Sequence, residues 1–534
     1  MFEDFNYGGG AGRDRAVAAG SNRPAARVEL YDAAGGFLSF TATDAAGAYA
    51  FAGLAPGSYS VRVVNASVTS SRAGYLPSLL PVQTFRTDAA FGVALPITDH
   101  VGGEIPALVD AGDGATTLAA LTTATTTAQS VAPVMLGATD VTGVDFGFSF
   151  NVVVNVNDTG QGSLRQFLTN ANALANAGLA QAGRTAGIDN AVFEIPGPGP
   201  HTIAPATWLP PITDPVVLDG TTQPGFSGNP IIELDGSATT YDGLQAGLKV
   251  LAGNSTVRGL VINRFAVDGI RLESGSNNLI EGNYIGTDVS GLLDRGNAFD
   301  GVFIVGGSAG NRIGGLPPGQ GNVISGNNDQ GIDLRIGSAN RIEGNLIGIA
   351  ADGTTALGNF RQGVLITGGT GNAVTANRIA ANGGLGIDLR DDGVTANDGV
   401  TTAGQPNLLM DFPIVTSALL AGSSLAVSGY IGSAPGQATF ANASVELFVA
   451  DADPTGFGEG RTLLGTLTAD ASGNFAGTLT VAGLTTGDRL TATATDPAGN
   501  TSEFGPNATV FAPVGMSGTV FEDFNYGGGA GRDR

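Results

Sequence analysis

The chain contains no cysteine, and its 534 residues include only two histidines, His100 and His201, and a single lysine, Lys249. The absence of cysteine excludes disulfide bonds, thiolate metal sites and cysteine nucleophiles. Two histidines far apart in sequence leave little scope for zinc coordination or for a Ser-His-Asp triad. Much of enzyme and metal chemistry is therefore disfavoured at the outset.

Positive charge is also scarce, because 24 Lys and Arg stand against 47 Asp and Glu, which gives a formal net charge of −23. Such a chain repels polyphosphate and anionic membranes, so nucleic acid is a poor partner. The first residues lack the basic and apolar regions of a signal peptide, and the uncharged stretch 412–445 is interrupted by Gly422 and several serines. We expect no signal peptide and no membrane span in this sequence.

Charged residues make up only 13% of the chain, whereas glycine accounts for 85 residues and apolar residues for 42%. Long exposed helices need more Lys and Glu than this, and a disordered chain would be less apolar. The length is that of three or four domains. The predicted fold class is all-β.

A stretch of fourteen residues, FEDFNYGGGAGRDR at 2–15, recurs unchanged at 521–534, an offset of 519 residues. This offset is far longer than the repeat of a solenoid and indicates a multidomain block repeated in tandem. Met1 stands where Val520 stands in the second copy. We interpret the chain as one period of a larger protein, with 513–534 as the first strand and loop of the next block.

Residues 1–150 contain short alternating runs, such as Arg27–Tyr31 and Tyr59–Val63, separated by turn signals. This pattern predicts a small antiparallel β-sandwich. The Ala/Thr-rich stretch 111–140 is predicted to be an irregular insertion within it.

The motifs FEDFNYGGGAGRD, TDAAGAYAFAGLAPGSYSV and VTGVDFGFSF in this region resemble the B-type repeat domains of Ser-Asp-rich bacterial surface adhesins, which are related to carboxypeptidase regulatory-like sandwiches. Members of that group hold calcium in a loop after the first strand. The matching positions here are Asp4, Asn6 and Asp14. Three glycines at 8–10 stand where further acidic ligands are expected, so the implied calcium site departs from the family pattern.

Residues 151–413 are predicted to form a right-handed parallel β-helix, since a Gly-apolar-x-apolar pattern recurs at intervals of 22, 32, 30, 32 and 23 residues. Each such unit buries its apolar face only by stacking on its neighbours. The NDTGQGSLR run at 157–165 and GNVISGN at 321–327 resemble parallel β-helix repeats of large bacterial surface and autotransporter-like polypeptides. The repeats begin at Gly247, Gly269, Gly301, Gly331, Gly363 and Gly386.

One helix is predicted at 163–178, where Ser163 and Gln166 form a capping box ahead of apolar residues at helical spacing. A β-helix has unpaired strand edges at its end, and we interpret this helix as the cap that covers them. A partner-binding helix is the alternative.

A second motif, Asn-x-[Ile/Val]-x-[Gly/Ala]-Asn, recurs within the predicted β-helix. Asparagine tolerates left-handed turns, and stacked amides hydrogen-bond from one rung to the next. We therefore predict asparagine ladders at the corners, with sugar recognition as the alternative. The predicted ladder positions are Asn278, Asn283, Asn340, Asn345, Asn372 and Asn377.

Many β-helix proteins cleave polysaccharides, so charged side chains on the outward columns bear on catalysis. Rungs with opposite charges two residues apart, Arg271/Glu273, Asp333/Arg335 and Asp388/Arg390, alternate with the largely apolar Phe303/Val305 and Leu365/Thr367. Such pairs are typical of surface ion pairs. We predict no catalytic residue and interpret the acidic stretch with Asp391, Asp392, Asn397 and Asp398 as a solvated or calcium-binding loop.

Residues 414–512 return to short strands separated by turns, which predicts an immunoglobulin-like sandwich. The run TATATDPAGNTSEF at 491–504 resembles bacterial immunoglobulin-like adhesin domains, some of which bind calcium between modules. Asp451, Asp453 and Glu459 are hard oxygen donors close in sequence, and calcium prefers such ligands. They form a second candidate calcium site.

The sequence as a whole predicts a right-handed parallel β-helix flanked by two β-sandwich domains, in a non-catalytic, extracellular or cell-surface segment of a giant bacterial adhesin or filament protein. Gly518, Thr519, Val520 and Phe521 restore the first strand that the N-terminus lacks, which predicts strand donation from one copy to the next. The expected partners are copies of the chain or adjacent blocks, a surface glycan or a host receptor. The alternative is a polysaccharide-active or polysaccharide-binding protein, for which outward aromatics such as Phe303 would contact sugar.

Overall fold

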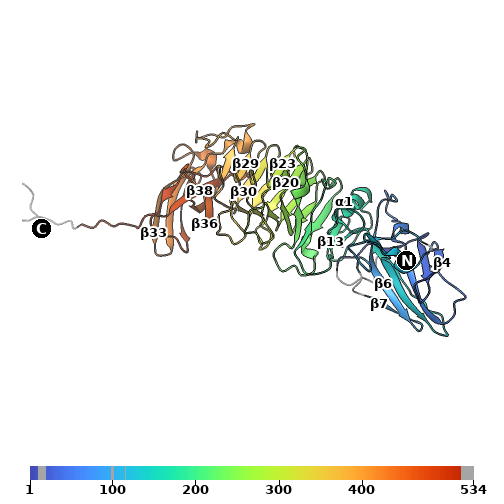
Figure 1. The fold of residues 1–534 in the computed structure, drawn as a ribbon. Coiled ribbons are helices and arrows are strands. Elements are labelled where there is room, and N and C mark those ends of the chain that lie inside the picture. The colour runs from blue at the N-terminus through green and yellow to red at the C-terminus, as the bar shows by residue number, and fades with distance from the viewer. Residues whose placement is uncertain (10–19, 98–100, 115, 519–534) are drawn as a thin grey trace, which may run out of the picture.

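A computed structural model describes residues 1–9, 20–97, 101–114 and 116–518. Figure 1 shows an elongated molecule with a twisted sheet at the N-terminal end, a stack of parallel strands in the middle and antiparallel strands at the C-terminal end. None of the helices in these ranges is long and apolar enough to cross a membrane.

The N-terminal region forms one nine-stranded sheet in the order β2-β1-β11-β6-β10-β5-β3-β4, with β7 paired to β6. The sequence predicts antiparallel pairing here, but β1 pairs with β11 in parallel and so does β10 with β6. The strands are β1 (Phe2–Asp4), β2 (Gly20–Asn22), β3 (Arg27–Tyr31), β4 (Phe37–Ala42), β5 (Gly57–Val63), β6 (Val82–Ala90), β7 (Val93–Ile97), β10 (Ser130–Leu136) and β11 (Phe146–Ser149).

The Ala/Thr-rich stretch is not irregular throughout, which corrects the prediction for 111–140. It contains β9 (Thr126–Thr127), which pairs with β8 (Val109–Asp110) just before the stretch, and β10, which pairs with β5 along seven residues. Ser130, Ala132 and Val134 are buried on one face of β10. Buried and exposed residues alternate along β10 as in a half-buried strand, and the threonine run directly before it hides this pattern in the sequence.

The predicted helix is present as α1 (Leu164–Ala173), which is shorter than 163–178. Ser163 Oγ accepts a hydrogen bond from Gln166 N at 3.1 Å, but the Gln166 side chain donates to Asn170 and Ser78 instead of completing the capping box. The helix ends at Ala173 because Leu174 adopts an extended backbone conformation and Ala175 N donates to Ala73 O. Figure 1 shows α1 where the parallel stack meets the N-terminal sheet.

The middle of the chain is a three-sided stack of parallel strands, one sheet to a side. The first side comprises β12 (Val152–Val153), β13 (Asp189–Phe193), β15 (Val216–Asp219), β18 (Thr256–Arg258), β21 (Leu279–Glu281), β24 (Arg312–Gly314), β27 (Arg341–Glu343) and β30 (Ala373–Thr375). The second comprises β14 (His201–Ile203), β16 (Ile232–Asp235), β19 (Leu260–Asn263), β22 (Tyr284–Ile285), β25 (Val323–Ile324), β28 (Leu346–Ile347) and β31 (Arg378–Ile379).

The third side carries the glycine repeats and comprises β17 (Ala246–Val250), β20 (Asp268–Glu273), β23 (Val302–Val305), β26 (Ile332–Leu334), β29 (Val364–Ile366) and β32 (Ile387–Leu389). Branched residues stack in register inside, as in the pairs Ile270–Val302 and Val302–Ile332, and all three are fully buried. The repeating glycine is required by close packing, because a Cβ at Gly301 would lie 2.7 Å from the carbonyl oxygen of Gly331.

The C-terminal unit contains two antiparallel sheets that share one apolar core. Val427 and Phe475 of the first sheet and Val445 and Leu490 of the second lie in that core. The strands are β33 (Pro413–Ala421), β34 (Ser424–Ile431) and β37 (Asn474–Thr480) in one sheet, and β36 (Gly460–Thr468), β35 (Ser444–Ala450), β38 (Arg489–Thr495) and β39 (Ala508–Thr509) in the other.

Candidate functional site at the end of the β-helix

The last rung of the parallel stack ends against the C-terminal unit, and three glutamates of that unit accept hydrogen bonds from its backbone. We name the contacts of Glu446, Glu459 and Glu503 with the stack the junction. An end rung has no further rung to accept its amide protons, so these groups need other acceptors. The bonds run from Ala376 N to Glu446 (3.0 and 2.9 Å), from Asn382 N to Glu459 (2.9 Å) and from Leu389 N to Glu503 (2.9 Å).

Other side chains of the C-terminal unit complete this set of acceptors. They come from the turn before β36 and from the segment after β38, so one unit reaches all three sides of the stack. The bonds run from Ala381 N to Asp451 Oδ2 (3.0 Å), from Val374 N to Thr501 Oγ1 (2.9 Å) and from Gly371 N to Asn500 Oδ1 (2.6 Å). The end of the β-helix is therefore satisfied by polar groups from its neighbour.

The apolar core also continues across the junction. Phe448 and Phe504 belong to the same buried cluster as the core of the stack, and their rings meet edge to face with centroids 5.6 Å apart. The C-terminal unit thus closes the stack with both apolar and polar contacts.

Burial dominates the electrostatics of the junction. It raises the pKa of Glu503 to about 7, against the opposing effect of the amides of Leu389 and Thr395. Burial likewise raises the pKa of Glu446, and it holds the pKa of Glu459 well above its ordinary value. All three carboxyl groups therefore bind a proton more readily in the folded protein than in the unfolded chain.

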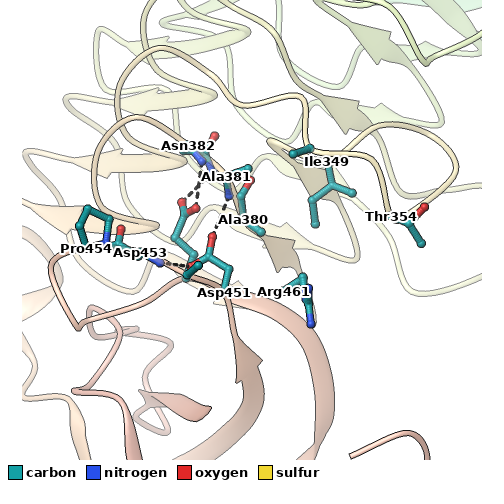
Figure 2. A pocket seen from close by; sticks show the side chains of 12 residues that line it. Ile349, Thr354, Ala380, Ala381, Asn382, Asp451, Asp453, Pro454 and Arg461 are labelled. Atoms are coloured by element: carbon teal, nitrogen blue, oxygen red, sulfur yellow. Dashed lines mark hydrogen bonds between the residues drawn. The ribbon is translucent and has the colours of Figure 1, made fainter. Parts of the chain in front are cut away.

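A small cavity of about 380 Å³ lies beside Glu459, and its lining includes Asp451 and Arg461. Figure 2 shows Asp451 beside Ala381 and Asn382 of the stack, and Asp451 Oδ2 accepts a hydrogen bond from Ala381 N. These hydrogen bonds attach the C-terminal unit to the last rung of the stack.

The second candidate calcium site is brought together only in part. Asp451 and Glu459 lie at the junction, and their oxygens accept hydrogen bonds from amide groups of the stack. Asp453 accepts a hydrogen bond from Thr455 N at 2.5 Å within its own turn. Among the residues that the structure describes, no group of three or more His, Cys, Asp or Glu side chains could hold a metal ion.

The first candidate calcium site lies partly outside the described residues, because Asp14 is not among them. Asp4 is buried in β1, and its Oδ1 accepts a hydrogen bond from Asn6 N at 3.1 Å. The Asn6 contact is a local turn in which the carboxylate caps the backbone two residues on.

The asparagines form three hydrogen-bonded ladders, and the six predicted positions occupy two of them. In each, a side-chain oxygen accepts from both the backbone N and the side-chain Nδ2 of the asparagine one rung earlier, as Asn345 does from Asn322 at 3.0 and 2.9 Å. The ladders are Asn278–Asn311–Asn340–Asn372, Asn283–Asn322–Asn345–Asn377 and Asn297–Asn327–Asn359–Asn382.

The ladders continue into the junction. Asn382 ends the third ladder and donates through Nδ2 to Glu459 at 2.8 Å. The first ladder passes to Asn407, whose side chain donates to Thr501 O at 3.0 Å. The C-terminal unit therefore caps two of the three ladders.

Two of the three predicted ion pairs on the third side form, Arg271 with Glu273 and Arg335 with Asp333, whereas Arg390 pairs with Asp392 instead of Asp388. The aspartates of these columns are buried, which corrects the prediction that both partners lie at the surface. Asp333 is fully buried while its partner Arg335 is half-exposed, 2.8 Å away. Asp388 is also buried and contacts Gln362 rather than Arg390. Asp333 also lies near the carboxyl groups of Asp300, just before β23, and Asp268, at the start of β20, and we name these three residues the acidic row.

Burial and mutual repulsion raise the pKa values along this acidic row. Burial raises the pKa of Asp268 to about 7 and that of Asp333 to about 6. Asp300, buried between them and repelled by both, has a pKa well above its ordinary value. A carboxyl group with a raised pKa beside a second carboxyl group can act as a general acid. The three carboxyl groups of the acidic row are, however, buried.

Phe303 is not an outward platform for sugar, contrary to the alternative prediction. Its exposed fraction is only 7%, and the guanidinium groups of Arg271 and Arg335 lie 4.8 and 5.1 Å from its ring centroid. Both charged groups would have to move before a sugar ring could stack there.

The stretch 391–398 does not gather its acidic groups at one point. Asp391 contacts Gln362 of the preceding rung, Asn397 donates to Phe412 O and Gly432 O, and Asp398 accepts from Val400 N. Of the predicted assembly strand, Gly518 is exposed in an extended segment, and Thr519, Val520 and Phe521 lie outside the described residues.

The residues that sequence reasoning missed are Glu446 and Glu503. Glu446 lies in β35 between the buried Val445 and Leu447, and Glu503 lies inside the run that carries the immunoglobulin-like resemblance. Their only sequence signal is an acidic residue amid buried neighbours. Their partners, 70 and 114 residues away, become visible only in the folded chain.

Comparison with known proteins supports the class that the strand pairing defines. A family model described as a right handed beta helix region matches residues 246–404. This part of the chain is a right-handed parallel β-helix, within an all-β protein.

Two solved structures are similar over much of the chain at low scores. One is ORF18 of Geobacillus virus E2, with 12% identity, a TM-score of 0.23 and coverage of 70% of this chain and 80% of that one. The other is full-length tailspike protein 2 (TSP2, ORF211) from Escherichia coli O157:H7 bacteriophage CAB120, with 10% identity, a TM-score of 0.12 and coverage of 82% and 74%. Neither likeness carries the assignment, which rests on the strand pairing and the family model.

Proposed function

We propose that this chain is a non-catalytic structural segment of a large, repetitive extracellular or bacterial cell-surface protein of the adhesin or filament kind. The observation that carries the proposal is the junction, where the neighbouring unit supplies acceptors to the last rung and extends its core. A β-helix closed in this way transmits force along its axis instead of ending in a free edge. The repeated fourteen-residue stretch supports a tandem array of such rods.

Head-to-tail linking by a donated C-terminal strand is part of this proposal. A surface glycan or a host receptor is the expected external partner, since an extended array would present such contacts away from the cell. The B-type and immunoglobulin-like resemblances support this placement.

The first test measures the shape of the molecule in solution. Small-angle X-ray scattering of the purified chain should fit a single elongated particle, and Glu446→Ala combined with Glu503→Ala should broaden its distribution of lengths. Thr485→Ala, at an exposed turn of the same unit, serves as the matched control. A wild-type chain as variable in length as the double variant would contradict the structural role.

A polysaccharide-active protein is the second candidate, and the acidic row favours it because its pKa values suit a general acid. Its carboxyl groups are buried, however, and Asp333 is paired with Arg335 at 2.8 Å. A panel of neutral and uronate polysaccharides should yield no new reducing ends and no unsaturated products. Cleavage that Asp333→Asn abolishes would overturn the non-catalytic proposal.

A further inference from the structure

The N-terminal sheet has a groove on its core side that its own strands leave open. The groove has a volume of about 720 Å³ and begins at Met1, the first residue before β1. Its apolar lining includes Leu30, Tyr49, Phe51, Leu136 and Val144. A groove of this size with apolar side chains in its wall, beside the end of a strand, is the kind of site that accepts an added strand.

The two walls of the groove are segments that resemble strands but are not paired as strands. Residues 48–52 and 141–145 carry alternating apolar side chains, yet neither segment belongs to a strand of the sheet. The Tyr49 hydroxyl spans the groove and donates to Val144 O at 2.7 Å. The Tyr49 hydroxyl therefore bonds to a backbone carbonyl that could instead accept a hydrogen bond from the backbone of a strand inserted between the two walls.

The register of β1 shows which residues would fit. Phe2 lies opposite Gly147 and Glu3 opposite Phe148 in a parallel pair. Phe2 corresponds to Phe521 in the repeat, so extending the register backwards places Gly518 opposite Val144 and Met516 opposite Thr142.

The alternation of a strand then fixes which side chains enter the groove. The Met1 side chain is buried in the core, and a period of two puts the side chains of Met516 and Val514 on the same face as Met1. In the described structure Val514 is 97% exposed and Met516 is fully exposed. Two apolar side chains are therefore exposed to solvent, and the wall of the groove offers apolar side chains that match them.

Figure 1 shows that the segment after β39 and the N-terminal sheet, whose residues line the groove, lie at opposite ends of the molecule. We infer that residues 513–518 of a second copy insert into this groove as an additional strand between 48–52 and 141–145. The inference rests on the proposed structural role and specifies its head-to-tail contact.

Truncation provides the first test, since all strands of the C-terminal unit end before Ala512. Sedimentation velocity over a range of concentrations should show self-association for the full chain and for a chain ending at Gly518, but monomers for a chain ending at Ala512. Association that persists without 513–518 would overturn the inference. So would association of the full chain that is lost in the chain ending at Gly518, because residues beyond the segment would then be the occupant.

A matched pair of substitutions tests which face of the segment 513–518 enters the groove. Met516→Asp places a charge in the groove and should weaken association about tenfold or more, whereas Ser517→Asp points away and should leave it nearly unchanged. Equal effects of the two substitutions would contradict the insertion.

The absence of cysteine allows a test of register. Met516→Cys combined with Thr142→Cys should give an oxidised cross-link between two copies, and Met516→Cys with Ser39→Cys, on the exposed β4, should give none. A cross-link within one molecule, or equal yields from both pairs, would overturn the inference. Monomers at every concentration with no cross-link would also overturn it, while the rod measured by scattering would still support the structural role.

Discussion

Each ladder asparagine uses its side-chain oxygen twice, and this double use makes single positions matter. The oxygen of Asn345 accepts from two nitrogens of Asn322, and both residues are buried. A buried donor without an acceptor costs far more than the net value of an ordinary hydrogen bond. The ladders are therefore sites where removal of one amide leaves two others unpaired.

Asn345→Ala should accordingly lower the free energy of unfolding by about 2–4 kcal/mol. Asn328→Ala, at an exposed asparagine one rung away with a single bond to Asn297 O, should cost under about 1 kcal/mol. Urea denaturation of the two variants beside the wild type measures both values. Equal losses would show that the ladder adds nothing beyond an ordinary surface contact.

Glu503 gives the junction a defined response to pH. Burial raises its pKa from 4.5 to about 7, so folding favours the protonated form. Its contribution to stability is fully present below about pH 4.5 and is lost as the pH rises through about 7, on the order of 3 kcal/mol. Glu503→Gln does not titrate and should flatten the stability profile between about pH 5 and pH 8. Denaturation across this range checks it, and a slope equal to that of the wild type would count against the assignment.

Calcium should have little effect on the described sites, because Asp451 and Glu459 already accept hydrogen bonds from the stack. We expect millimolar calcium, compared with chelator, to shift the melting temperature by less than about 1 °C. Differential scanning fluorimetry measures this directly. A rise of several degrees that Asp451→Asn removes would support a calcium site at Asp451.

At the scale of elements, α1 shows how a short helix serves as a cap. Leu164, Phe167, Leu168 and Ala171 enter the core of the stack, while the polar side of the helix bonds to the N-terminal region through Gln166 and Asn170. The helix therefore belongs to the β-helix core as much as a strand does.

Phe167→Ala should cost about 3–5 kcal/mol, because its ring is buried at the end of the stack and a cavity would remain. Thr169→Ala removes a half-buried side chain whose hydroxyl bonds only to Arg165 O within the helix, and should change stability by under about 1 kcal/mol. Thermal unfolding of both variants compares the two faces. A similar cost for both would mean that α1 does not cap the core.

The elements also show what sequence can and cannot predict here. The rungs could be predicted because every rung repeats its glycine, its apolar pair and its asparagines, so the same physical requirement appears many times. The parallel pair β1–β11 could not, since it joins residues about 145 apart without any repeated signal. Glu446 and Glu503 could not be predicted either, because their role depends on which amides the last rung leaves unpaired.

At the scale of the whole molecule, the shared core implies that the stack and the C-terminal unit unfold together. Phe448 and Phe504 lie in the core of the stack although they belong to the neighbouring unit. Scanning calorimetry should show one transition for these two parts. Glu446→Ala combined with Glu503→Ala should split it into two, with Thr485→Ala as the control that does not. Two transitions in the wild type would show that the junction couples the parts only weakly.

The three asparagine ladders have a consequence for how such a molecule changes in evolution. Every rung offers its successor the same donors and acceptors, and only the last one meets the dedicated acceptors of Glu459 and Asn407. If an internal rung is duplicated or lost, α1 at one end of the stack and the C-terminal unit at the other therefore still meet rungs with the same donors and acceptors. The number of rungs can therefore change without a change at either end of the stack, and related proteins can differ in length while keeping the same end units.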